Sequence, residues 1–154
     1  MYYAELQEIF GRMPFGLRNY WSGRFLRELP DELIQSTADH LDGGVPGSIM
    51  FEPIFGAAAR VPLEATAFAG RDAAYNATFL ASWEDAAEDE RRIAAAREFS
   101  ELLSPWTTGA AYVNYASEFD DEEYGTERFA RLREVKRRYD PENRFRFNHN
   151  ISPD

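Results

Sequence analysis

Apolar residues recur at every second position over residues 75–83, and this is the clearest pattern in the chain. The alternation places one set of side chains on one face of an extended segment, namely Tyr75, Ala77, Phe79, Ala81 and Trp83. Such alternation is typical of a β-strand with one buried face. Weaker patterns of the same kind predict further strands over residues 17–26, 48–55 and 109–116.

Three other segments repeat their apolar residues at helical spacing, over residues 31–42, 85–103 and 126–139. Asp85 is a good N-cap for the second helix, and Pro105 and Pro141 follow the ends of the second and third. The repeating positions are Leu33, Ile34, Thr37 and Leu41 in the first, Ile93, Ala96, Phe99 and Leu103 in the second, and Phe129, Leu132, Val135 and Tyr139 in the third.

Strands separated by amphipathic helices predict an α+β fold, with an antiparallel sheet and helices packed on one face. We expect at least four strands. We also expect helices 85–103 and 126–139 to share one face of the sheet, because each has a single apolar stripe to bury. No repeat or linker divides the sequence, so residues 1–154 are expected to form a single domain.

Composition and charge narrow the classes of partner. Hydrophobic residues make up 44% of the 154 positions, which is too many for a disordered chain. The net charge of −10 argues against nucleic acid and anionic membranes as partners, since both need clustered cations. No apolar stretch approaches the ~20 residues of a membrane span, and no secretory leader is evident, so a cytoplasmic location is expected.

The sequence contains few candidates for metal or thiol chemistry. There is no cysteine, and therefore no disulfide, thiolate ligand or cysteine nucleophile. Residues 120–123 are acidic but lack the alternating spacing and glycine of a calcium loop. His40 and His149 stand alone, outside any histidine motif for a metal. We therefore assign no metal site.

A tyrosine and an asparagine two positions apart carry the most specific candidate chemistry. If residues 109–116 are a strand, Tyr112 and Asn114 lie on one face, and Val113 and Tyr115 on the other. A carboxamide can hydrogen-bond the polar edge of a ring cofactor, and a phenol oxygen can take a proton from a substrate. A phenol is a weak base at neutral pH, so nearby cations such as Arg18 or Arg24 would help. The same spacing also fits an ordinary half-exposed strand.

Several motifs agree, in order, with a known family. They are Asn19-Tyr20-Trp21, Gly56 to Val61 followed by Phe68 and Arg71, Tyr112-Val113-Asn114, Tyr139-Asp140-Pro141 with Asn143, and Asn148-His149-Asn150-Ile151. This set resembles the substrate domain and C-terminal segment of the berberine-bridge-enzyme-like FAD-linked oxidases, with the berberine-like segment at about residues 110–154. The resemblance implies that Tyr112 acts as or beside the base that deprotonates substrate, and that Asn114 contacts the flavin. It also implies that Asn148 and Asn150 lie near the flavin ring, and that Tyr20 lines the substrate cavity.

The chain also departs from that family. Nothing in it resembles the domain that binds most of FAD, and a position commonly occupied by histidine in a Phe-x-His-Arg motif is Gly70 here. The resemblance therefore implies a substrate-binding, flavin-covering domain of an FAD-dependent oxidoreductase that oxidises a small hydroxylated or amine substrate. It would need an FAD-binding domain or subunit as partner, and would be inactive alone.

A second hypothesis belongs to a different class. The chain could be a non-catalytic remnant or interaction module that self-associates through an uncovered sheet face, giving a homo-oligomer. Aromatic residues on such a face favour association when no other domain covers it.

Overall fold

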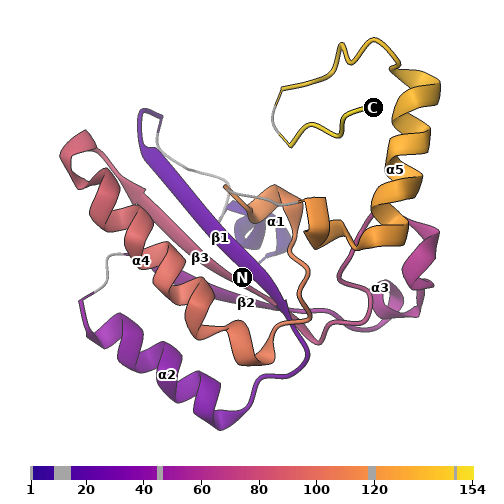
Figure 1. Cartoon of the computed structure of the whole chain (residues 1–154). Coiled ribbons are helices and arrows are strands. Elements are labelled where there is room, and N and C mark those ends of the chain that lie inside the picture. Colours follow the sequence, from indigo (N-terminus) through magenta and orange to yellow (C-terminus); the bar gives the residue numbers. More distant parts are fainter. Residues whose placement is uncertain (1, 9–14, 45–46, 118–120, 148) are drawn as a thin grey trace.

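A three-stranded antiparallel sheet forms the centre of the molecule (Figure 1). The structure is a computed structural model that describes residues 2–8, 15–44, 47–117, 121–147 and 149–154, without the side chains of residues 6, 121 and 122. The strands are β1 (Arg18–Leu26), β2 (Ser48–Pro53) and β3 (Tyr75–Trp83), in the order β1-β3-β2. These three strands were predicted, and the α+β fold is confirmed.

Two helices cover one face of this sheet, as predicted (Figure 1). They are α2 (Asp31–Asp42) and α4 (Asp89–Leu102). The alternating residues of β3 meet them, and the side chains of the resulting core are almost completely buried. The core includes Leu26, Leu33, Ala77, Phe79, Ala81, Ala96, Phe99 and Leu103. Burial of each large apolar side chain contributes about 1.5–3 kcal/mol, so this layer supplies much of the stability of the fold.

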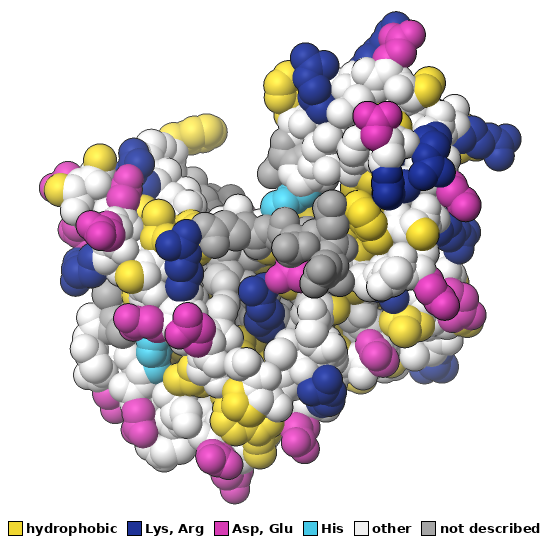
Figure 2. Space-filling model, in the orientation of Figure 1, with side chains coloured by type: hydrophobic (Ala, Val, Ile, Leu, Met, Phe, Trp, Pro, Cys, Tyr) yellow, Lys and Arg dark blue, Asp and Glu magenta, His cyan; other side chains and the backbone are white. Residues whose placement is uncertain are grey.

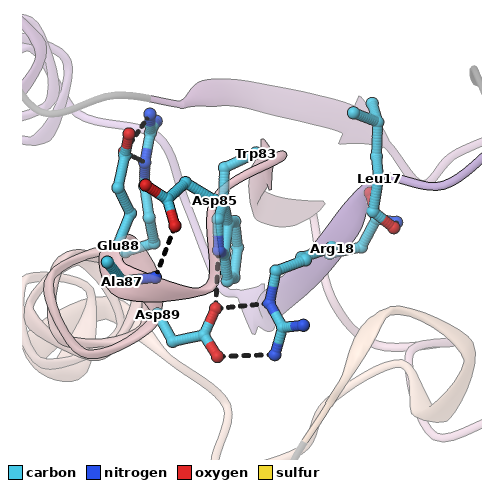
Figure 3. Close-up of polar contacts among 9 residues, drawn as sticks. Leu17, Arg18, Trp83, Asp85, Ala87, Glu88 and Asp89 are labelled. Carbon is cyan, nitrogen blue, oxygen red and sulfur yellow. Dashed lines mark hydrogen bonds and ion pairs between the residues drawn. The ribbon is translucent and has the colours of Figure 1, made fainter.

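The first turn of α4 is tied to the start of β1 by a charged contact (Figure 3). The Arg18 guanidinium donates two hydrogen bonds of 2.5 Å to the Asp89 carboxylate, and the Trp83 indole nitrogen donates a third at 2.7 Å. The hydrogen bond from Arg18 is the main reason why the pKa of Asp89 lies below its usual value. Just before the helix, the Asp85 carboxylate accepts from the backbone N–H of Ala87 at 2.9 Å and caps a 3₁₀ turn.

Shorter elements connect these layers. They are α1 (Tyr3–Glu8), α3 (Ala57–Arg60) and the 3₁₀ turns Leu63–Ala65, Ala86–Glu88, Ser104–Trp106, Val113–Tyr115 and Asp121–Tyr124. Among the described residues, no helix has both the length and the apolar character needed to cross a membrane.

Helix α5 (Thr126–Tyr139) forms where predicted but does not cover the sheet. It lies to one side (Figure 1), where the Phe129 ring stacks on Tyr124 at 6.2 Å and Arg131 donates to the backbone oxygen of Glu64 at 2.9 Å. Val135 and Tyr139, from its apolar stripe, are 47% and 72% exposed. The expectation that α4 and α5 share one face is therefore wrong, because α2 and α4 already occupy that face.

Basic side chains dominate α5, in contrast to the acidic chain as a whole. Figure 2 shows dark blue side chains gathered over this helix at the upper right. After the helix, the Asp140 carboxylate accepts from the Lys136 ammonium and from the backbone N–H groups of Arg144 and Phe145. The hydrogen bond from Lys136 is the largest cause of the lowered pKa of Asp140. These bonds hold the turn that sends the C-terminal tail back along α5.

Candidate functional site

The segment after α4 runs along the outer edge of β1 and positions the candidate site. The N–H of Thr108 donates to the Phe25 oxygen at 2.8 Å, and the N–H of Phe25 donates to Ala110 at 3.0 Å. Further along, the N–H of Ser117 donates to the Trp21 oxygen at 2.9 Å. Between these two attachments the chain leaves the edge of the sheet.

Residues 112–115 form a 3₁₀ turn in this gap, where a strand was predicted. The N–H of Tyr115 donates to the Tyr112 oxygen at 2.9 Å, which closes the turn. The predicted fourth strand is thus wrong, and the sheet that the described residues form has three strands. An interrupted pairing with β1 replaces it, because the 3₁₀ turn breaks the extended backbone.

The turn brings Tyr112 and Tyr115 together. A 3₁₀ helix has about three residues per turn, so positions i and i+3 eclipse each other. The two rings meet edge to face, with centroids 5.0 Å apart. Strand alternation had predicted opposite faces for them, and that prediction is wrong. The expected pairing of Tyr112 with Asn114 is present, since the Asn114 amide nitrogen donates to the Tyr112 hydroxyl at 2.9 Å.

These tyrosines join aromatic residues on the sheet face opposite α2 and α4, which we call the open face. Trp21 lies 5.7 Å from the Tyr115 ring, and Phe68 lies 5.7 Å from the Tyr112 ring. Phe25 completes the group at 6.4 Å from Tyr112. A hollow of about 310 Å³ adjoins the group; its lining includes Phe68, Tyr112 and Asn114.

Polar groups occupy the middle of the open face. Asn76 of β3 is 3% exposed, and its amide nitrogen donates to the Glu52 carboxylate of β2 at 2.8 Å and to the Thr78 hydroxyl at 3.1 Å. Its amide oxygen is buried without a hydrogen-bond partner among the described residues, and so is the indole nitrogen of Trp21. Buried polar groups normally have partners, so these two atoms are unsatisfied polar groups within the aromatic cluster.

The surroundings of Tyr115 change the pKa of its hydroxyl. Burial raises the pKa of Tyr115, and the negative charge of Glu52 and the nearby Tyr112 raise it further. The Glu52 carboxylate lies close enough to the Tyr115 hydroxyl to contribute to this rise in pKa. The open face therefore links Tyr112, Tyr115, Glu52 and Asn76 in one cluster of aromatic and polar side chains.

Three residues of this cluster were not identified from the sequence: Glu52, Asn76 and Tyr115. Alternation along β3 does place Asn76 on the polar face of the central strand, and that was a usable signal. Glu52 could have been noticed as the one charged residue of β2. Its position beside Asn76 could not, because that depends on how β2 pairs with β3.

Other sequence candidates lie elsewhere. Tyr20 pairs with Ala81 and is buried in the core beneath α4, so it faces away from Tyr112, contrary to the expectation that it lines the same cavity. Arg18 is bound to Asp89, and Arg24 pairs with Glu123 at 3.0 Å. The two expected helper cations are therefore engaged with carboxylates.

The tail asparagines are not joined to Tyr112 in the part of the chain that the structure describes. Asn148 lies outside the described residues. Asn150 is exposed in the tail, which returns along α5 through a 2.8 Å hydrogen bond from Arg137 to the Pro153 oxygen. Within the described ranges, no three His, Asp or Glu side chains are grouped so that they could hold a metal ion.

Comparison with known proteins identifies the family. Residues 111–152 match the family described as "Berberine and berberine like". The chain is 33% identical over 137 residues to the uncharacterized FAD-linked oxidoreductase YvdP of Bacillus subtilis (strain 168), a match that covers 86% of this chain and 30% of that protein. It is 32% identical over 160 residues to (R)-6-hydroxynicotine oxidase of Paenarthrobacter nicotinovorans, covering 94% of this chain and 34% of that protein.

Solved structures share the fold. The 6-hydroxy-D-nicotine oxidase from Arthrobacter nicotinovorans matches with a TM-score of 0.72 and 31% identity, over 97% of this chain and 35% of that one. BBE-like 1 of Physcomitrella patens matches with a TM-score of 0.81 and 21% identity, over 94% of this chain and 32% of that one. This chain thus spans about a third of the length of its relatives, and it belongs to the berberine-bridge-enzyme-like FAD-linked oxidases.

Proposed function

We propose that this chain supplies the substrate side of an FAD-dependent oxidoreductase that oxidises a small hydroxylated or amine substrate. The observation that carries the proposal is the pair formed by Tyr112 and Asn114, held at the open face by the 3₁₀ turn. An FAD-binding domain or subunit would cover this face, with substrate between the two. FAD, when bound, supplies the hydride acceptor.

The open face suits a planar aromatic group. Its aromatic side chains offer edges and faces for stacking, and the buried indole nitrogen of Trp21 and amide oxygen of Asn76 still lack hydrogen-bond partners among the described residues. Asn114 would hold the polar edge of the flavin, as the family resemblance implies, and Asn148 and Asn150 would approach it from the tail.

Tyr112, once its hydroxyl proton has left, would receive the substrate proton. Its oxygen already accepts a hydrogen bond from the Asn114 amide, which stabilises negative charge on the phenol oxygen. Removal of a proton from a hydroxyl or amine makes hydride loss from the adjoining carbon easier. Tyr112 and Asn114 would therefore act together, one in proton transfer and the other in holding the phenol and the cofactor edge.

The test replaces Tyr112 by phenylalanine in the full-length protein that carries this chain with its flavin domain. Flavin reduction by substrate should slow by about 10²- to 10⁴-fold, the usual contribution of a general base, while the FAD content stays nearly unchanged. Tyr139→Phe is the matched control, because Tyr139 is exposed on α5. If Tyr112→Phe reduces flavin as fast as Tyr139→Phe does, Tyr112 takes no part in proton transfer.

The alternative is that the open face binds a second copy of the chain. Its central aromatic residues, Trp21, Phe68, Tyr112 and Tyr115, are of the type that anchors protein interfaces. In that case the full-length protein would lack substrate-dependent flavin reduction, and Trp21→Ala would dissociate its oligomer in sedimentation experiments.

A further inference from the structure

Glu52 places a carboxylate in the polar centre of the open face. It pairs directly with Asn76 across β2 and β3, so the two side chains lie on the same face. The amide nitrogen of Asn76 donates to the carboxylate at 2.8 Å. Since Asn76 is almost completely buried, the carboxylate is held in a fixed position by a rigid partner.

No positive charge compensates this carboxylate within the described part of the chain. Its contacts are with a neutral amide, Asn76, and a neutral phenol, Tyr115. None of the ion pairs among the described residues includes Glu52: Arg24 pairs with Glu123 at 3.0 Å, and Arg71 donates to the backbone oxygen of Ala58 at 2.9 Å. A carboxylate that becomes covered without a counter-charge is strongly unfavourable.

A group of aromatic rings begins beside this carboxylate. The Tyr115 side chain lies near Glu52, and its ring contacts those of Trp21 and Tyr112, with centroids 5.7 Å and 5.0 Å away. Aromatic faces attract organic cations, and the attraction grows when water is removed. A carboxylate beside such rings has the two features that recognise a cationic nitrogen group.

We propose that Glu52 makes this site selective for small molecules that carry a cationic nitrogen, which would pair with the carboxylate between the aromatic rings. This inference rests on the proposed function, because the substrate is the molecule held on the open face. It assigns Glu52 a role in specificity, whereas proton transfer belongs to Tyr112.

The test compares two probes of the same shape and different charge, choline and 3,3-dimethylbutan-1-ol. Calorimetric titration of the full-length, flavin-containing protein should show that choline binds about tenfold or more tightly. Glu52→Gln keeps the size of the side chain and its acceptor for Asn76, and it should reduce the difference to within about twofold. Glu32→Gln, an equal loss of charge on the exposed side of α2, should retain the full preference.

Equal binding of the two probes by the unaltered protein would overturn the proposal, and so would an unchanged preference in Glu52→Gln. Either of these results can be distinguished from a failure of the proposed oxidase function. Flavin reduction by uncharged alcohols with no preference for cations would leave the oxidase function in place and remove only the role of Glu52. Absence of reduction by any substrate would remove the oxidase function, while the binding comparison would still decide the specificity of the site.

Discussion

The two faces of one small sheet differ in the kinds of side chain that they bring together. Beneath α2 and α4, apolar residues such as Phe79 and Phe99 are fully buried and pack ring to ring at 5.7 Å. On the open face, aromatic rings surround a hydrogen-bonded polar group, and the Asn76 oxygen and Trp21 nitrogen are buried without partners among the described residues. The same three strands thus carry an apolar core on one side and a cluster of aromatic and polar side chains on the other.

The covered face should give the largest loss of stability when it is altered. Phe99→Ala removes a fully buried ring that contacts Phe79 and His40, and we expect the free energy of unfolding to fall by about 3–5 kcal/mol. Urea denaturation followed by circular dichroism measures the change. Val135→Ala, at a half-exposed position on α5, should change stability by about 0.5 kcal/mol or less. Similar losses in the two variants would show that the core is not where the structure places it.

A smaller effect is expected beside the open face, where Phe25 packs against the backbone of Gly70. A β-carbon at residue 70 would overlap the Phe25 ring, and that ring is almost fully buried. Gly70→Ala should therefore destabilise the fold by about 1–3 kcal/mol through overpacking. Gly23→Ala is a milder comparison, since its nearest contact would be the Thr78 hydroxyl at 3.1 Å. Equal stability of Gly70→Ala and the parent in denaturation would mean that Phe25 can move freely.

The smallest effect concerns the response of the open face to alkali. The pKa of Tyr115 is raised in the folded state by burial and by Glu52. The folded protein therefore holds this proton more tightly than the unfolded chain, whose tyrosine pKa is about 10. The associated stability is complete below about pH 10 and is lost as the pH rises through the folded pKa. Tyr115→Phe should lessen the fall in unfolding free energy as the pH rises above about 10, measured by urea denaturation at each pH.

Tyr139→Phe serves as the control for that experiment, because its ring is exposed on α5. It should retain the alkaline slope of the parent protein. An identical slope in Tyr115→Phe would show that the folded environment of residue 115 does not disfavour the phenolate.

The regular elements were predictable because their patterns are local. Alternation in β3 and helical spacing in α2, α4 and α5 each lie within a short segment, and all four elements form near their expected bounds. The position of α5 was not predictable in this way. The apolar stripe of α5 shows that one side of the helix is apolar, but it does not show which surface that side contacts. The sheet face expected for α5 is already covered by α2 and α4.

The candidate site was harder to predict, because its geometry depends on one turn and one strand pairing. Tyr112, Val113, Asn114 and Tyr115 fit an extended strand as well as a 3₁₀ turn, and only the structure separates the two. The bond between Asn114 and Tyr112 forms in this turn. The contact between Glu52 and Asn76, which are 24 residues apart in the chain, depends on the register in which β2 pairs with β3.

The 3₁₀ turn also limits how the length of the chain can vary at this point. Because one residue advances such a turn by about 120°, inserting or deleting a residue between Tyr112 and Tyr115 would swing one ring away from the other. It would also shift the attachment of Ser117 to Trp21 on the far side of the turn. Substitutions at residue 113 leave that spacing intact. In laboratory evolution, this segment should therefore accept changes of residue type far more readily than changes of length.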